Sequence, residues 1–351
     1  MKRALALAVD HRPHPNPRVG AVIIDRDGRI LAEGAHMGPG NHHAEIEALA
    51  RLEGHVPPGS TMVVTLEPCN HHGRTPPCVE ALIAAGLDRV VVGAVDPDPR
   101  AAGAGIARLE AHGIAVESGV LADAVERADP AYFHHRRKGR PLVTFKTAST
   151  LDGQTAARDG TSQWITSAEA RVDAHRLRAR ADCVVVGAGT LRADDPQLTV
   201  RGDHDRDDQP VGVVVAGDHP LPSEARLWRR PDTLVLSTHP VVVPAENIVV
   251  SPDSSGRPDP AAVLSELGDR GYLAVLLEGG ARLAASFWAA ALIDVGVSYL
   301  GAKVAGGAGT AMFDGPWNTL GDAVSVAVTD VQQVGPDVRI TWTAASPPSQ
   351  E

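Results

Sequence analysis

The chain has 351 residues, which is long enough for two domains that each bury a core of their own. Hydrophobic residues make up 43% of it and charged residues 22%, the composition of an ordinary soluble protein. The net charge of -10 argues against a general nucleic-acid binder, because such a protein needs a basic face to displace counterions.

Targeting signals and membrane spans are not expected. The apolar stretch that follows Lys2 and Arg3 ends at Asp10, which is too short for the hydrophobic region of a signal peptide. The longest uncharged apolar run, 283–293, is about half of a membrane span. We therefore expect a cytoplasmic protein that does not bind membranes. Its three cysteines fit a reducing compartment without disulfides.

The first 140 residues alternate between apolar runs rich in β-branched residues and amphipathic runs. This alternation predicts a layered α/β sheet. In chain order it predicts a strand at 19–24, a helix from His43, a strand at 61–65, a helix from Cys78, a strand at 90–95, and helices at 105–112 and 121–137. The charged run that follows, ended by Gly139 and Pro141, predicts a domain boundary near residue 140.

One histidine and two cysteines in this half predict a catalytic Zn2+ site. His43 starts one predicted helix, and Cys69 and Cys78 lie at the two ends of a loop rich in His, Gly and Pro. Catalytic zinc takes three protein ligands and keeps its fourth position for water. Glu45 would not be a ligand, so it is the candidate proton shuttle, as in zinc deaminases of nucleobase-like rings.

Other arrangements of the same residues remain open. A structural zinc site closed by His71 or His72 is the strongest alternative, although Glu45 would then have no role. His42 competes with His43 for the ligand position. The third cysteine, Cys183, lies in an apolar run and is expected to be a buried strand residue.

The second half has its own α/β pattern, with strands predicted at 142–146, 184–187, 211–215, 233–236, 273–277 and 338–342. Two glycine clusters follow predicted strands. The first, at Gly187 and Gly189, lacks the third glycine of a dinucleotide fingerprint. The second, Gly279-Gly280, leads into a helix predicted at 281–293 and favours either a phosphate cradle or a tight turn.

The zinc-site segments closely resemble the deaminase half of the RibD family of bifunctional riboflavin-biosynthesis deaminase/reductases. The matching segments are 14–20 around Asn16, His43-Ala44-Glu45, 67–69 and 73–78. Eight residues separate the two cysteines, whereas general cytidine and tRNA adenosine deaminases have Cys-x-x-Cys. The resemblance implies a cytidine-deaminase-like α/β/α sheet with substrate contacts at Asn16, and we expect His71 and Arg74 to point toward substrate or to brace the loop. Asn70 departs from the serine common in the family.

The second half resembles the reductase half of the same family, through segments 146–153, 162–167, 189–201 and 278–280. The resemblance implies a dihydrofolate-reductase-like α/β domain that uses NADPH. It implies cofactor contacts at Ala148, Trp164, Thr190, Asp194, Gly280, Ala281, Arg282, Leu283, Ala284, Ala285 and Ser286. It implies substrate contacts at Ser162, Arg178, Leu198, Arg201 and Glu278.

The basic residues among these suit a phosphorylated sugar. Arg178 and Arg201 can bind a phosphate through paired hydrogen bonds. Lys146 is predicted to be catalytic, polarising or protonating the sugar oxygen as hydride arrives.

Together these observations predict a bifunctional cytoplasmic enzyme of riboflavin synthesis that acts on a phosphorylated pyrimidine. The predicted parts are a zinc-dependent deaminase at 1–140, an NADPH-dependent reductase at 141–345, and a disordered tail at 346–351. The family resemblance makes a dimer or tetramer reasonable. Two alternatives are a nucleoside or nucleic-acid deaminase fused to a binding domain, and a non-catalytic interaction protein held together by zinc.

Overall fold

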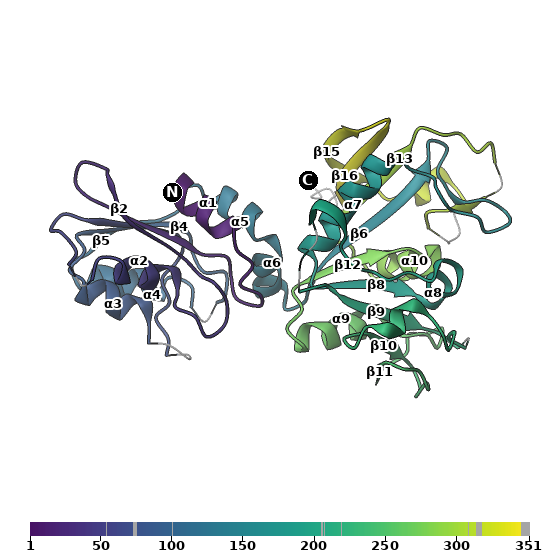
Figure 1. Cartoon of the computed structure of the whole chain (residues 1–351), viewed down its shortest axis with the longest axis horizontal. Helices are drawn as coiled ribbons and strands as arrows, with labels where there is room; N and C mark the ends of the chain where they lie inside the picture. The colour runs from purple at the N-terminus through teal and green to yellow at the C-terminus, as the bar shows by residue number, and fades with distance from the viewer. Residues whose placement is uncertain are drawn as a thin grey trace. The chain divides into compact units, whose positions relative to one another are not determined.

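The computed structural model describes residues 1–53, 55–72, 76–99, 101–204, 206, 208–218, 220–307, 309–313 and 318–344. The chain divides into two compact units, Met1–Gly139 and Arg140–Glu351 (Figure 1). Each unit has its own main sheet. Arg74, predicted to face the substrate or brace the loop, and the tail 346–351, predicted to be disordered, lie outside the described residues.

The first unit is built on a five-stranded sheet in the order β2-β1-β3-β4-β5. β1 runs antiparallel to both of its neighbours, and β3, β4 and β5 run parallel to one another. The strands are β1 (Gly20–Ile24), β2 (Ile30–Ala35), β3 (Thr61–Leu66), β4 (Arg89–Ala94) and β5 (Ala115–Glu117). The predicted strands are therefore present, and a turn at Asp27-Gly28, where Gly28 has a φ of 79°, joins β1 to β2.

Helices cover both faces of this sheet. α2, α3 and α4 pack on one face, where Ala44, Val79 and Leu109 meet Ala21 and Ile23 of β1 in one core. α1 packs on the other face through Ala4 against Val22 and Val63 (Figure 1). The alternation of β1 side chains between these two cores is what a strand buried on both faces requires. The helices are α1 (Lys2–Val9), α2 (Ala44–Ala50), α3 (Cys78–Ala84), α4 (Ala104–Ala111), α5 (Ala122–Ala128) and α6 (Pro130–Lys138).

The single helix predicted at 121–137 is wrong, because the structure has two helices there. α5 ends at Ala128, and α6 begins at Pro130. Asp129 between them has a φ of -138°, outside the helical range. Proline fits the first turn of a helix but not its interior, so Pro130 starts a new helix.

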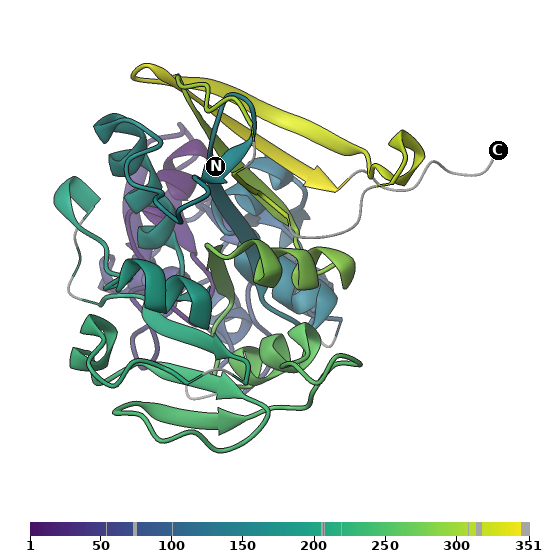
Figure 2. The ribbon, with the colours of Figure 1, turned by 90° about the vertical axis from the view of Figure 1, so that its right-hand side faces the viewer.

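The second unit is built on a nine-stranded sheet in the order β11-β10-β9-β8-β12-β6-β13-β16-β15. The seven strands from β11 to β13 are parallel, and the β15–β16 hairpin joins them antiparallel at one edge (Figure 2). The strands are β6 (Leu142–Thr150), β8 (Cys183–Gly187), β9 (Val211–Ala216), β10 (Leu234–Ser237), β11 (Glu246–Val249), β12 (Ala274–Glu278), β13 (Val295–Gly301), β15 (Val326–Val334) and β16 (Asp337–Ala344). A separate pair is formed by β7 (Gln154–Ala156) and β14 (Thr310–Ala311).

Two layers of helices enclose this sheet. α9 and α10 pack on one face through Val263 and Phe287, and Cys183 is buried in that core, as predicted for a strand residue. Leu177 of α7 and Leu191 of α8 pack on the other face. The helices are α7 (Ala168–Arg180), α8 (Ala188–Asp194), α9 (Pro260–Asp269) and α10 (Ala281–Ala289), with short 3₁₀ turns at Gly202–His204, Arg226–Arg229 and Leu320–Asp322. Among the described residues no helix is both long enough and apolar enough to cross a membrane.

Candidate active sites

The three predicted zinc ligands come together in the first unit. His43 immediately precedes α2, Cys69 follows β3, and Cys78 is the first residue of α3. The His43 Nδ1 atom lies 3.1 Å from the Cys78 Sγ atom and 3.5 Å from the Cys69 Sγ atom. Zinc bonds of about 2.0 Å to nitrogen and 2.3 Å to sulfur place tetrahedral ligands about 3.5–3.8 Å apart, so these donors fit zinc.

Within the part of the chain that the structure describes, the group of possible metal ligands contains three residues. His71 and His72 are exposed, and His72 faces Glu80 at 3.7 Å. The His42 side chain faces Glu47 at 3.3 Å. A site closed by a fourth histidine, or one that uses His42, therefore has no support in this geometry.

The electrostatics of the cluster reflect shared protons. A hydrogen bond with Cys78 stabilises the Cys69 thiolate and lowers the pKa of Cys69 to about 4. The same hydrogen bond, together with burial, raises the pKa of Cys78. The two sulfur atoms thus compete for one proton. A divalent cation would displace this proton, because cysteine ligands bind a metal as thiolates.

Glu45 lies in the first turn of α2, two residues from His43, and is only 3% exposed. Burial raises the pKa of this carboxyl group, and the neighbouring Cys69 raises it further. The Glu45 side chain also hydrogen-bonds to Cys78. A buried carboxyl group that readily holds a proton beside the ligand cluster has the placement of a proton shuttle.

Asn16 is held beside this cluster by His36, a residue that the sequence reasoning missed. The His36 Nδ1 atom lies 2.9 Å from the carbonyl oxygen of His42, so Nδ1 carries the proton and donates it. The His36 Nε2 atom must then accept the 2.8 Å hydrogen bond from the Asn16 amide nitrogen. This arrangement leaves the side-chain oxygen of Asn16 as an acceptor for a ligand.

Glu67 is a second residue whose role the sequence did not reveal. Its carboxylate accepts four backbone N–H bonds, from Asp96, Gly103, Gly105 and Ile106, at 2.9–3.3 Å. These donors include the N-terminus of α4, which favours a negative charge. Glu67 thereby fixes the start of the Pro68-Cys69 loop against α4. No sequence signal short of the fold itself pairs residue 67 with residues 96–106.

The second unit places the predicted reductase residues around the carboxyl ends of β6 and β12. Lys146 of β6 is the register partner of Glu278 in β12. Lys146 also lies close enough to Asp194 to interact electrostatically, and Asp194 hydrogen-bonds to Ser162. The catalytic candidate and two residues assigned to cofactor and substrate are therefore brought together.

Arg178 and Glu278 form a buried ion pair. The Arg178 Nε and Nη2 atoms donate to the two Glu278 carboxylate oxygens at 2.7 and 2.9 Å, and Nη1 donates to the carbonyl of Thr199 at 3.0 Å. Burial opposes ionisation of Glu278, but Arg178 outweighs it and holds the pKa of Glu278 at about 2. Arg178 already uses its paired donors here, so a paired contact with a phosphate would require this ion pair to open.

We expect Glu278→Gln to destabilise the second unit by about 3–5 kcal/mol, because it leaves the Arg178 charge buried and unpaired. All five tryptophans lie in this unit, so urea unfolding followed by tryptophan fluorescence reports on it selectively. Glu126→Gln, which breaks an ion pair in the first unit, is the control and should leave the transition unchanged. The unfolding midpoint of the double variant Arg178→Met/Glu278→Leu should be closer to that of the wild type than the midpoint of the single variant. A wild-type midpoint for Glu278→Gln would contradict this account.

The Gly279-Gly280 turn fits a dinucleotide phosphate. Both glycines have positive φ angles, 76° and 74°, and α10 begins at the next residue. A side chain at position 279 would meet the Thr190 Oγ1 atom at 2.8 Å, so the turn brings backbone close to Thr190, another predicted cofactor contact. Backbone N–H groups at a helix start bind anions. Further along α10 the Ala284 side chain is buried in the core, so it is not available to a ligand.

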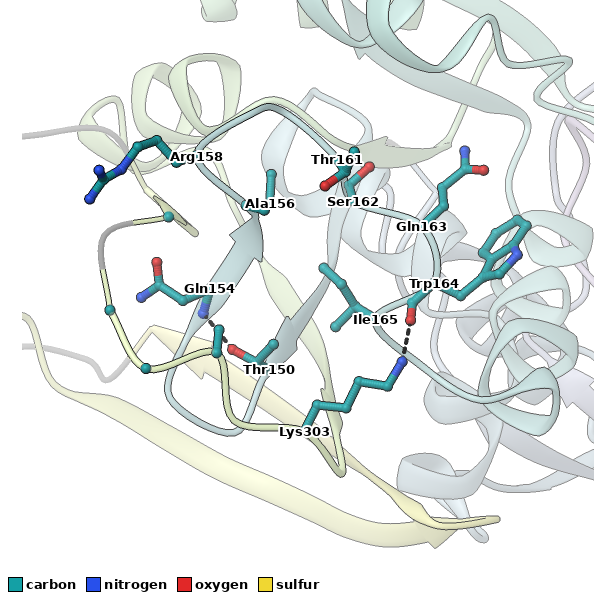
Figure 3. Close-up of a pocket in the computed structure, with 15 residues that line it drawn as sticks. Thr150, Gln154, Ala156, Arg158, Thr161, Ser162, Gln163, Trp164, Ile165 and Lys303 are labelled. Atoms are coloured by element: carbon teal, nitrogen blue, oxygen red, sulfur yellow. Dashed lines mark hydrogen bonds between the residues drawn. The ribbon is translucent and has the colours of Figure 1, made fainter.

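Ser162 and Trp164 line a cavity of about 370 Å³, which Figure 3 shows with Lys303 extending to the carbonyl oxygen of Trp164. The Trp164 side chain is 60% exposed, and the Arg171 guanidinium lies 4.3 Å from the centre of its ring. An exposed, pre-oriented indole is a suitable surface for a planar ligand.

Of the other predicted contacts, Ala148 lies on β6 and is half-buried, whereas Leu198 is buried with a φ of 54°. Arg201, three residues further along, is exposed, and no ion pair or hydrogen bond joins it to any residue that the structure describes.

Comparison with known proteins assigns both units. Residues 1–94 match the cytidine and deoxycytidylate deaminase zinc-binding region, and residues 141–340 match the RibD C-terminal domain. Fold and sites thus define a zinc-binding deaminase unit joined to a reductase unit, which confirms the predicted fold class. The chain belongs to the RibD family of riboflavin biosynthesis proteins.

The relatives match nearly the whole chain. It is 41% identical to the riboflavin biosynthesis protein RibD of Mycobacterium tuberculosis, over 97% of this chain and 96% of the relative. It is 36% identical to RibD of Escherichia coli, over 96% of each. The solved structure of Acinetobacter baumannii RibD superposes with a TM-score of 0.88 at 33% identity and covers 98% of each chain. The deaminase/reductase of Thermotoga maritima gives the same score at 34% identity, over 98% of this chain and 97% of that one.

Proposed function

We propose that residues 1–140 deaminate 2,5-diamino-6-(5-phosphoribosylamino)pyrimidin-4(3H)-one and that residues 141–345 reduce the ribosyl group of the product to ribityl with NADPH. The observation that carries the proposal is the meeting of His43, Cys69 and Cys78 beside the buried Glu45, in the unit that matches a zinc-binding deaminase region. The RibD-type second unit supplies a use for the deaminated product.

In the first reaction water replaces the exocyclic 2-amino group, so that a C–N bond breaks, a C=O bond forms and ammonia leaves. His43, Cys69 and Cys78 would hold a zinc ion, which when bound would supply a nucleophile at neutral pH by lowering the pKa of water from near 16 to about 7. Glu45 takes the proton of the attacking water and gives it to the leaving nitrogen. The raised pKa of Glu45 supports this role, because the group must hold a proton between the two transfers.

The substrate contacts in this site follow from the same geometry. The side-chain oxygen of Asn16, turned away from His36, accepts a hydrogen bond from a ring or amino N–H. His71 is exposed on the loop between the two cysteine ligands and contributes a polar contact. Arg74, on the same loop, is assigned a substrate contact by family resemblance alone.

In the second reaction bound NADPH would supply a hydride to the sugar carbon, so that a C–H bond forms, the ring C–O bond at that carbon breaks and the released oxygen takes a proton. Lys146 donates a proton or hydrogen bond to the sugar oxygen, and it interacts electrostatically with Glu278 and Asp194. Ser162, Leu198 and Arg201 form the substrate side. The cofactor side comprises Ala148, Trp164, Thr190, Asp194, Gly280, Ala281, Arg282, Leu283, Ala284, Ala285 and Ser286, with Ala284 contributing backbone only because its side chain is in the core.

The enzyme is proposed to work in the cytoplasm as a homo-oligomer, either dimer or tetramer, and without nucleic acid. The net charge of -10 supports the last point, because a nucleic-acid substrate would require a basic groove.

Substrate preference tests the proposal for the first unit. The diaminopyrimidine phosphate should release ammonia with a kcat/KM at least about 10³-fold above that of cytidine or deoxycytidylate, because a site built for several polar contacts discriminates strongly against ligands that lack them. A preference for cytidine or deoxycytidylate would contradict the proposal and favour a general cytidine-type deaminase.

A further inference from the structure

His175 is a polar residue of the second unit to which neither the sequence nor the family resemblance gives a role. It lies on α7, one turn before Arg178, and this spacing places both residues on the same side of the helix. Its Nδ1 atom is buried without a hydrogen-bond partner. Buried polar atoms nearly always have partners in native proteins, so an unpaired one calls for an explanation.

The surroundings of His175 are the reductase site itself. Its charged neighbours come from four segments: Arg178 on its own helix, Arg201 on the loop after α8, Glu278 on β12 and Lys146 on β6. All four are predicted catalytic or substrate-binding residues. His175 is thus a fifth member of this cluster.

The environment also indicates which ring nitrogen carries the proton. A buried N–H without an acceptor is rarer in proteins than a buried acceptor without a donor. The unpaired Nδ1 is therefore the bare nitrogen, and the proton of the neutral ring lies on Nε2. No residue that the structure describes accepts a hydrogen bond from Nε2, so this N–H is available to a ligand.

We propose that His175 is a further substrate-binding residue of the reductase site, where its Nε2 N–H donates a hydrogen bond to the phosphate of the substrate beside Arg201. The inference rests on the proposed reduction of a phosphoribosyl compound. A phosphate fits because Arg201 is a cation without a partner among the described residues, whereas Arg178 is engaged with Glu278.

The charge state of the ring agrees with a donor role. Burial, followed by the positive charges of Arg178 and Arg201, lowers the pKa of His175 to about 4. The ring is therefore neutral at pH 7 and has one N–H to donate. A bound phosphate would offset the positive charges of Arg178 and Arg201. The neutral ring itself would not oppose the binding of the substrate.

Kinetics with a phosphorylated and a phosphate-free substrate test the proposal. His175→Ala should raise KM for the deaminated ribosylaminouracil phosphate about 10- to 100-fold, the effect of losing a hydrogen bond to a charged group, with kcat within about threefold. KM for the phosphate-free compound should not change. His175→Gln places an amide N–H near the position of Nε2 and should restore KM, whereas His175→Asn, whose amide lies near Nδ1, should not.

Controls distinguish a loss of substrate binding from a folding defect and from a failure of the proposed function. Val172→Ala, at an exposed position of the same helix, should behave as wild type. Tryptophan fluorescence should show the same unfolding midpoint for the glutamine and asparagine variants, which makes their comparison valid even if the alanine variant is unstable. An unchanged KM in His175→Ala and His175→Asn, or an equal rise for both substrates, overturns the inference. Absence of NADPH oxidation by the wild-type enzyme would instead contradict the proposed function.

Discussion

Glu45→Gln should reduce ammonia release by about 10²–10⁴-fold while the protein keeps its zinc, because general acid–base catalysis contributes a factor of this size. Glutamine has nearly the same shape as glutamate but cannot accept and return a proton. Glu45 is not one of the three grouped donor residues, so the metal content should stay at one zinc per chain. Metal analysis of the purified variant, together with an ammonia assay, measures both quantities.

The matched control for this experiment is Glu47→Gln, two residues further along α2. Glu47 faces His42, is partly exposed and is not one of the grouped ligand residues. Its replacement should leave the rate of deamination within about twofold of wild type, as is usual for surface substitutions. A Glu45→Gln variant that still deaminates would rule out Glu45 as the proton shuttle. Loss of zinc from it would mean that Glu45 helps to hold the metal.

Removal of zinc should abolish ammonia release and spare the reduction of the deaminated substrate. The three ligands all lie in the first unit. A chelator removes the metal ion that would generate the nucleophile from water. The second unit has a core and a cluster of charged residues of its own. Dialysis against a chelator, followed by separate assays of ammonia release and NADPH oxidation, measures the two activities.

Two cysteine variants provide the control for metal removal. Cys69→Ala should lose zinc and deamination together, whereas Cys183→Ala should keep both because Cys183 is buried in a strand of the other unit. Added zinc should restore ammonia release to the chelated wild type and to chelated Cys183→Ala, but not to Cys69→Ala. Parallel loss of both activities on chelation would contradict the assignment of the sites to separate units.

The zinc cluster could be predicted because each of its residues carries a local signal. His43 and Cys78 lie at helix starts, and Cys69 follows a strand. The local sequence around each residue is therefore enough to place all three at one edge of the sheet. His36 and Glu67 give no such signal. Their roles depend on hydrogen bonds to the backbone of residues 42 and 96–106, which exist only once the loops have folded.

The second unit was harder to predict because its contacts join distant parts of the chain. Arg178 and Glu278 are 100 positions apart, and only the packing of α7 near β12 makes them an ion pair instead of two free substrate ligands. β13 was missed because Gly296 and Gly301 interrupt its apolar pattern. Gly296 is needed there, since a Cβ at this position would lie 2.0 Å from the ring of Trp342.

The most direct test of the whole account supplies the diaminopyrimidine phosphate together with NADPH and follows ammonia and cofactor oxidation in the same sample. We expect one ammonia and one oxidised NADPH for each product molecule, with oxidation lagging behind ammonia release because the second unit acts on the product of the first. NADPH oxidation that precedes ammonia release, or that proceeds without it, would contradict the order of the two reactions. Ammonia release without any NADPH oxidation would contradict the role of the second unit.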